Sequence, residues 1–146
     1  MYSDMAKKKN LGRYSSGLEK YCAEQLESNN IDYEYEPKYT IVDGFKYPST
    51  YYKSVPKKEF MVEKTNKQLP ITYKPDFLLP ANSVFIETKG FVRRNDSFPL
   101  RWKLFMRFLL ESGMSHYRLF IPRNQKQVDQ IIEFLKNESE QIEQNV

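Results

Sequence analysis

The sequence is poor in the residues that form disulfides and zinc clusters. Its 146 residues include one cysteine, Cys22, and one histidine, His116. A single cysteine excludes an internal disulfide and a cysteine-based zinc cluster. A single histidine argues against a His-rich metal site and gives little support to a Ser-His-Asp triad. Carboxylates are therefore the candidate metal ligands of this chain.

Long apolar runs are missing as well. No stretch approaches the roughly 20 apolar residues that a bilayer-spanning helix needs, and the segment 1–9 lacks the apolar core of a signal peptide. We therefore expect a cytoplasmic protein. The chain length suits a single domain that buries most of its apolar surface without disulfides.

Positive charge exceeds negative charge, and it is unevenly spread. The formal net charge is +4, although residues 138–146 form an acidic tail. A basic surface is typical of proteins that neutralise phosphates, but many cytosolic proteins also have one. Residues 1–14 are predicted to be a disordered basic arm, which is either a simple flexible terminus or a phosphate-binding strap.

The segment 73–90 organises the rest of the chain. It is predicted to form two apolar strands, 74–79 and 84–89, joined by the turn-forming tetrad 80–83. If the turn is centred on the Ala81-Asn82 bond, the position numbers of facing residues have a constant sum. The facing pairs are then Leu79 with Val84, Phe77 with Ile86, and Asp76 with Glu87.

This register makes two carboxylates direct neighbours, which is destabilising unless a cation lies between them. Residues two apart on one strand share a face, so Lys89 joins Asp76 and Glu87. Mg²⁺ suits this place because one or two carboxylates hold it and leave coordination positions for a phosphate and a water. Lys89 would orient or activate that water, or stabilise the charge developing on phosphorus.

The same residues match a short nuclease pattern. Pro75-Asp76, ten residues, and then Glu87-Thr88-Lys89 fit the PD-(D/E)xK signature. The plain alternative is an exposed hairpin with charges on its wet face. However, the flanking residues are apolar on both faces, which predicts strands buried on both sides, where isolated charges are costly. Charges kept in such strands are often functional.

The first helix is predicted over 15–30, with Cys22 and Leu26 on its buried face. Glu19 in this helix has two interpretations. With Ser16 three residues earlier, it fits a capping box, in which the glutamate returns a hydrogen bond to the cap amide. It also borders the face that must pack on the sheet, from which it could reach the metal.

The remaining elements complete an α/β pattern. A strand over 31–36 precedes the segment 37–72, which we predict to be an extended β arm or bridge insertion with a hairpin turn at Asp43-Gly44. This order predicts a mixed sheet with helices on both faces, within a single domain over 15–137. The later elements are a helix over 99–112, a strand over 117–121, and a last helix capped by Asn124 that frays after Asn137.

Several motifs of the first ninety residues occur together and in order. They are Ser16-Gly17-Leu18-Glu19, Gln25-Leu26-Glu27-Ser28, Tyr33-Glu34-Tyr35-Glu36, Tyr73-x-Pro75-Asp76-Phe77-Leu78-Leu79-Pro80 and Phe85-Ile86-Glu87-Thr88-Lys89-Gly90. In this set the chain resembles the bacteriophage endonuclease I family, the Holliday-junction resolvases of podophages, within the PD-(D/E)xK nuclease superfamily. The segment between Glu36 and Tyr73 is longer than the bridge of that family, and the match is faint after Gly90.

The resemblance implies a restriction-endonuclease-like core in a homodimer that binds four-way and branched DNA. It implies paired phosphodiester cuts with Mg²⁺ or Mn²⁺, in the cytoplasm of a phage-infected or bacterial cell. Asp76, Glu87 and Lys89 would form the catalytic core, with Glu19 as the remaining catalytic acid, and Asp76, Glu87 and Glu19 as metal ligands. The family's dimer is domain-swapped, so Glu19 would act in trans to the other three.

Two other functions remain open at this stage. One is a nuclease of the same core with another DNA substrate, such as a restriction or transposon-end enzyme; no helix-turn-helix or zinc module supports it. The other is a non-catalytic DNA-binding protein that keeps the fold. The residues that we predict to bind DNA are Lys7, Lys8, Lys9, Arg13, Lys74, Arg93, Arg94, Arg101 and Lys103.

Overall fold

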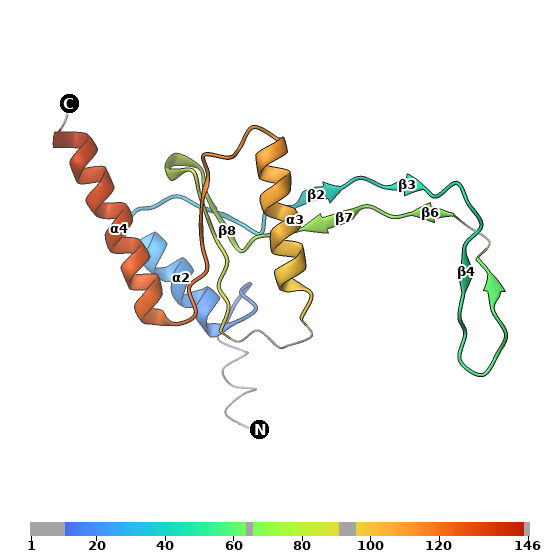
Figure 1. The fold of residues 1–146 in the computed structure, drawn as a ribbon. Helices are drawn as coiled ribbons and strands as arrows, with labels where there is room; N and C mark the ends of the chain where they lie inside the picture. Colours follow the sequence, from blue (N-terminus) through green and yellow to red (C-terminus); the bar gives the residue numbers. More distant parts are fainter. Residues whose placement is uncertain (1–10, 64–65, 91–95, 145–146) are drawn as a thin grey trace, which may run out of the picture. The chain divides into compact units, whose positions relative to one another are not determined.

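The computed structural model describes residues 11–63, 66–90 and 96–144, and the chain divides into two compact units (Figure 1). The segment Lys38–Tyr73 forms one unit, and the residues on either side of it form the other. Among the described residues, no helix is long and apolar enough to cross a bilayer.

The first unit is built around a four-stranded mixed sheet in the order β1-β8-β9-β10. Strands β8 (Phe77–Leu79) and β9 (Val84–Ile86) are antiparallel and are joined by the 3-10 turn η1 (Pro80–Asn82). Strand β1 (Glu34–Tyr35) is antiparallel to β8, and β10 (Arg118–Phe120) is parallel to β9. The predicted mixed sheet is therefore confirmed.

Helices cover both faces of this sheet, as the sequence order predicts (Figure 1). Helices α2 (Gly17–Ser28) and α4 (Gln125–Gln144) pack together on one face, and α3 (Phe98–Glu111) lies on the other, where the rings of Phe85 and Phe105 are 5.1 Å apart. Side chains alternate along a strand, so neighbouring residues enter different layers. The core under α2 and α4 includes Phe77, Leu79, Val84 and Ile86.

Short polar side chains cap the first turns of α2 and α4. Ser16 accepts a hydrogen bond from the Glu19 amide at 3.1 Å, and Asn124 accepts one from the Gln127 amide at 2.8 Å. The predicted cap of the last helix is thus confirmed. The predicted fraying after Asn137 is wrong, because α4 continues to Gln144 and Arg118 of β10 forms an ion pair with Glu138.

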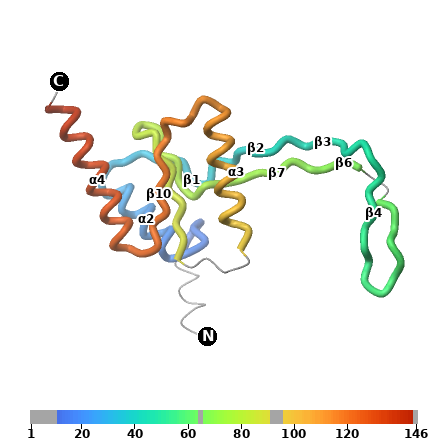
Figure 2. The backbone as a smooth tube through the Cα atoms, viewed as in Figure 1, coloured from blue at the N-terminus to red at the C-terminus, as the bar shows by residue number. Residues whose placement is uncertain are grey.

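The second unit is an arm of paired short strands (Figure 2). Each pair is antiparallel, so the arm is one long hairpin. This confirms the expectation of an extended β structure in this segment. The pairs are β2 (Tyr39–Val42) with β7 (Ile71–Tyr73), β3 (Phe45–Lys46) with β6 (Lys67–Gln68), and β4 (Tyr52–Lys53) with β5 (Met61–Val62).

The predicted hairpin turn at Asp43-Gly44 is wrong. The strands on either side of it pair with β7 and β6 rather than with each other, so the chain continues through Gly44 along one limb of the arm. The glycine is needed for another reason. A Cβ at this position would lie 3.1 Å from the Gln68 carbonyl oxygen and 3.2 Å from Cδ of Pro70 on the opposite limb.

Candidate metal centre

The β8–β9 hairpin holds two buried carboxylates side by side. The ladder pairs Phe77 with Ile86 and Leu79 with Val84, in the register that the sequence predicts. Continuing this register by one residue makes Asp76 and Glu87 facing neighbours. The Asp76 amide donates a hydrogen bond to Oε2 of Glu87 at 3.0 Å, and only 9% of Asp76 and 5% of Glu87 is exposed.

Thr88 fixes the Asp76 carboxylate. Its amide and its hydroxyl both donate to Oδ2 of Asp76, each at 2.7 Å. Two donors on one oxygen restrict the rotation of the side chain and leave Oδ1 for another partner. Thr88 is the middle residue of the Glu87-Thr88-Lys89 pattern, but the pattern itself assigns it no role.

Glu19 reaches the hairpin from the first turn of α2, and it is 2% exposed. Its Oε2 accepts hydrogen bonds from the Ser15 amide at 2.6 Å, the Ser15 hydroxyl at 2.8 Å and the Tyr35 hydroxyl at 2.9 Å. Of the two interpretations of Glu19, the capping box holds only in part: the Ser16 hydroxyl caps the Glu19 amide, but the Glu19 carboxylate accepts from the Ser15 amide, one residue before the predicted cap amide. The second interpretation agrees with the structure, because the carboxylate lies beside Asp76.

A fourth acid, Glu36, completes the group, and the sequence analysis did not single it out. One carboxylate oxygen from each of Glu19, Glu36 and Asp76 lies within 4.8 Å of the others. Glu36 has a left-handed backbone, with φ of 50°, and its amide donates to the Asp76 carbonyl at 2.9 Å. A glutamate rarely adopts this conformation, and such strained residues cluster at functional sites. The sequence feature that could have identified Glu36 is its position at the end of the alternating strand predicted over 31–36.

The charges of this group are not independent. Burial, the negative charge of Glu87 and a hydrogen bond with Glu19 raise the pKa of Asp76 to about 8. Burial alone would raise the pKa of Glu19, but hydrogen bonds from its neighbours, with Asp76 first, outweigh burial and lower it. Without a cation, Glu19 and Asp76 therefore share one proton at neutral pH, and it is held mainly by Asp76.

The donor set fits a hard divalent cation. Mg²⁺ and Mn²⁺ prefer carboxylate oxygens and water, and ligands on opposite sides of one Mg²⁺ ion are about 4.2 Å apart. The oxygens of Glu19, Glu36 and Asp76 lie within 4.8 Å of one another, a limit slightly wider than that spacing. A cation would also replace the proton that the crowded carboxylates otherwise retain. Asp76, Glu19 and Glu36 would hold it, and Glu87, which is bonded to the Asp76 amide, is a further candidate ligand.

Lys89 lies next to these acids, where the sequence placed it. Its Nζ is 3.7 Å from Oε1 of Glu87 and 4.5 Å from the centre of the Phe98 ring at the start of α3. The Lys89 amide donates to the Pro122 carbonyl at 3.0 Å, which anchors the backbone after β9. The ammonium group is therefore held at the edge of the acidic group.

Cys22 of α2 lies beneath the acidic pair. Burial, together with the negative charges of Asp76 and Glu19, raises the pKa of this thiol to about 12. The thiol therefore stays neutral at physiological pH and is not a nucleophile here. Its place in the apolar core agrees with the buried face predicted for the first helix.

The predicted DNA-binding residues fall into two groups. Arg13, Lys74, Arg101 and Lys103 are exposed. Of these, Lys74 precedes Asp76 by two residues, and Arg101 lies one turn after Phe98, which contacts Lys89. The others, Lys7, Lys8, Lys9, Arg93 and Arg94, lie outside the described residues.

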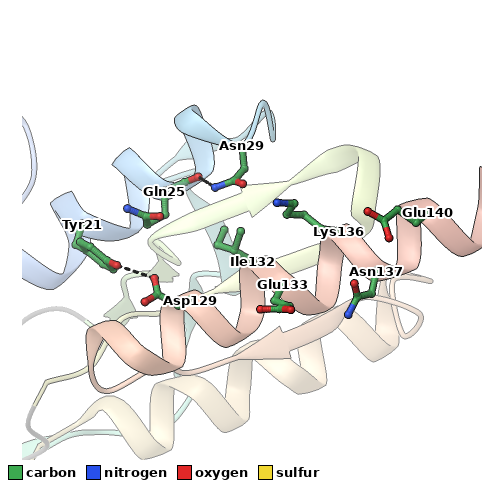
Figure 3. Close-up of a pocket in the computed structure, with 9 residues that line it drawn as sticks. All are labelled: Tyr21, Gln25, Asn29, Asp129, Ile132, Glu133, Lys136, Asn137 and Glu140. Atoms are coloured by element: carbon green, nitrogen blue, oxygen red, sulfur yellow. Dashed lines mark hydrogen bonds between the residues drawn. The ribbon is translucent and has the colours of Figure 1, made fainter.

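A polar groove of about 470 Å³ lies between α2 and α4, and Glu19 is not among the residues that line it (Figure 3). Tyr21, Gln25 and Asn29 line it from α2, and the Tyr21 hydroxyl donates to Asp129 of α4 at 2.6 Å. These three residues occupy one face of α2, whereas Glu19 and Cys22 occupy the buried face. The groove is therefore separate from the carboxylate site.

The site therefore consists of buried carboxylates with an adjacent lysine at the end of a sheet hairpin. These are the features of a candidate divalent-cation centre. Comparison with curated proteins supports the resemblance inferred from the motifs: 86 residues are 36% identical to Endonuclease I of Escherichia phage T7. The match covers 59% of this chain and 42% of that relative, so it spans less than half of the relative's length. No family model and no solved structure matched the chain.

Proposed function

We propose that the protein is a Mg²⁺- or Mn²⁺-dependent endodeoxyribonuclease that cuts four-way and other branched DNA junctions. The observation that carries the proposal is the meeting of Asp76, Glu87 and Lys89 with Glu19, in a chain similar to a protein named Endonuclease I. The net charge of +4 is also suited to a DNA substrate.

Each side chain of the site receives a role in this proposal. Asp76, Glu87 and Glu19 hold the metal, and Glu36 is added as a further ligand because its carboxylate adjoins two of them. Thr88 keeps the Asp76 carboxylate oriented. When bound, the ion supplies neutralisation of phosphate charge and lowers the pKa of a nearby water. Lys89 orients the attacking water or stabilises the charge that develops on phosphorus.

Paired cuts across a four-way junction need two sites, so the proposed enzyme is a homodimer. The arm supports this part, because it exposes large apolar side chains that a partner would cover, including Phe60 (77%) and Leu69 (75%). Glu19 and Asp76 meet within one chain here. In a domain-swapped dimer the same contact would form between chains, with Glu19 contributed by the partner.

The experiment compares cleavage of a synthetic four-way junction with cleavage of linear duplex of the same sequence. It uses wild type, Glu87→Ala, and Glu133→Ala as a matched control on the exposed face of α4, each with Mg²⁺ or with a chelator. Metal-dependent, junction-selective cutting that only Glu87→Ala loses supports the proposal. Equal cutting of linear duplex would favour a restriction-type nuclease, and tight junction binding without cutting would favour a non-catalytic DNA-binding protein.

A mixing experiment tests the swapped arrangement. Glu19→Ala chains are co-refolded with Lys89→Ala chains, and junction cleavage is measured. In a swapped dimer, one of the two sites receives an intact Glu19 and an intact Lys89, so part of the activity returns. In an unswapped dimer every site keeps one defect, and activity stays at the level of the separate variants.

A further inference from the structure

Arg13 lies over a cluster of three tyrosine rings just before the start of α2. The carbon of its guanidinium is 5.0 Å from the ring centre of Tyr35, 5.2 Å from that of Tyr14 and 6.0 Å from that of Tyr33. The residue is exposed, yet its position is fixed from one side. Stacking on aromatic faces is a common way to hold a guanidinium flat.

Hydrogen bonds to hydroxyl groups fix the guanidinium further. Its Nη2 donates to the Tyr14 hydroxyl at 3.2 Å and to the Tyr33 hydroxyl at 3.3 Å. The Tyr33 hydroxyl donates its own hydrogen to Glu27 at 2.6 Å. The 2.7 Å contact between the two hydroxyls must then be donated by Tyr14. Both hydroxyls therefore offer lone pairs to Arg13.

This arrangement leaves donors on Arg13 for a ligand. An arginine has five N–H groups, and the two on Nη2 are used by the tyrosines. Among the described residues, its side-chain hydrogen bonds go to these two hydroxyls, both neutral, so the positive charge is not cancelled by them. The N–H groups of Nε and Nη1 remain, in a planar arrangement that suits an oxyanion.

Tyr35 connects this arginine to the carboxylate site. Its ring is one of the three tyrosine rings under Arg13, and its hydroxyl donates to Oε2 of Glu19 at 2.9 Å. The same hydroxyl is 3.4 Å from the Arg13 carbonyl oxygen. A cation thus lies on one side of the Tyr35 ring, while the acid that would hold the metal lies at the end of the same ring.

We propose that Arg13 is the core of a phosphate-binding site, and that it holds a backbone phosphate of the bound DNA next to the carboxylate site. This inference rests on the proposed function: DNA is the source of the phosphate because the carboxylate site next to Arg13 is proposed to cut DNA. The tyrosines orient the guanidinium before binding, so little side-chain freedom is lost when the phosphate arrives. The site differs from a general basic surface because its geometry, not only its charge, contributes to binding.

The test separates geometry from charge by measuring junction affinity with Ca²⁺ in place of Mg²⁺ to suppress cutting. The variants are Arg13→Gln, Arg13→Lys and, as a control for charge alone, Lys136→Gln on α4. Arg13→Gln should weaken binding by about tenfold and reduce the slope of log affinity against log salt by about 0.9. Arg13→Lys should keep the slope of wild type but recover only part of the affinity.

A second variant tests the orientation by the tyrosines. Tyr33→Phe removes one hydroxyl from Arg13 and should weaken junction binding with no change in the salt slope, because the charge is retained. A purely structural role for Arg13 predicts instead a lower melting temperature with unchanged affinity and slope, and that result would overturn the inference. Equal losses in Arg13→Gln and Lys136→Gln would also overturn it, since they would indicate a general charge effect.

The outcome is distinguishable from failure of the proposed function. If wild type cuts junctions and Glu87→Ala does not, while Arg13→Gln binds and cuts like wild type, only the phosphate site is wrong. If wild type neither binds nor cuts DNA, the proposed function fails, and the phosphate site fails with it.

Discussion

The carboxyl groups of Glu19 and Asp76 meet in the first unit, although the whole β arm separates them in sequence. Both are buried, and their pKa values move in opposite directions: that of Glu19 is lowered and that of Asp76 is raised to about 8. One proton therefore belongs to the pair in the absence of metal. The predictions on stability and metal binding follow from this relationship.

Removing the acid at Asp76 should stabilise the metal-free protein at high pH. The folded-state pKa of Asp76 is about 8, above its usual value of 3.8. The stability linked to its protonated form is therefore complete below pH 3.8 and is lost as the pH rises towards 8. Asp76→Asn lacks this loss, so its advantage over wild type should grow steadily between pH 4 and pH 8, by roughly 1 kcal/mol per pH unit.

Denaturant unfolding with a chelator present, at several pH values, measures this difference in the free energy of unfolding. Asp32→Asn, the same substitution at an exposed position of the first unit, serves as the control. A difference between Asp76→Asn and wild type that does not change with pH would contradict the raised pKa.

Bound metal should stabilise the fold, and the size of this stabilisation should depend on the acids that surround the ion. At a concentration 100 times the dissociation constant, Mg²⁺ or Mn²⁺ should add about 2.7 kcal/mol to the free energy of unfolding. Glu19→Gln and Glu36→Gln should each reduce this gain, whereas Glu133→Gln should keep it. Thermal unfolding with and without metal tests this, and an undiminished gain in Glu36→Gln would remove that residue from the ligand set.

Thr88 should affect metal affinity through Asp76. Thr88→Val keeps the shape of the side chain but removes the hydroxyl that donates to Oδ2 of Asp76. A group that hydrogen-bonds to a metal ligand typically contributes about 10- to 100-fold to metal affinity. Titration calorimetry should show a loss in this range for Thr88→Val and a near-normal affinity for Thr88→Ser, which restores the donor. If both variants bind metal equally, the hydroxyl has no such role.

Lys89 should matter for rate and little for folding. It is partly exposed at the edge of the acidic group and pairs with Glu87 at 3.7 Å. If it stabilises charge in the transition state, Lys89→Ala should lower kcat by about 100-fold or more, while KM and the melting temperature change little. Single-turnover cleavage of a junction measures this, and a change confined to KM would make Lys89 a binding residue instead.

Local rules were sufficient for the hairpin and for most helix ends. The register of Phe77 with Ile86 follows from a two-residue period and a short turn, which involve only neighbours in sequence. The cap at Asn124 was predictable for the same reason. The turn assigned to Asp43-Gly44 failed because the opposite limb of the arm, not local preference, decides the conformation there.

The sequence by itself determined that Asp76, Glu87 and Lys89 belong together, because all three lie on one hairpin whose register is fixed by its turn. The helix face and the family resemblance made Glu19 a candidate for the same site. Only the tertiary structure decided that Glu36 joins Glu19 and Asp76, and that Arg13 lies over Tyr14, Tyr33 and Tyr35. These contacts depend on how α2 and β1 pack against β8. No local pattern specifies them, because they form between segments that come together only when the apolar core is buried.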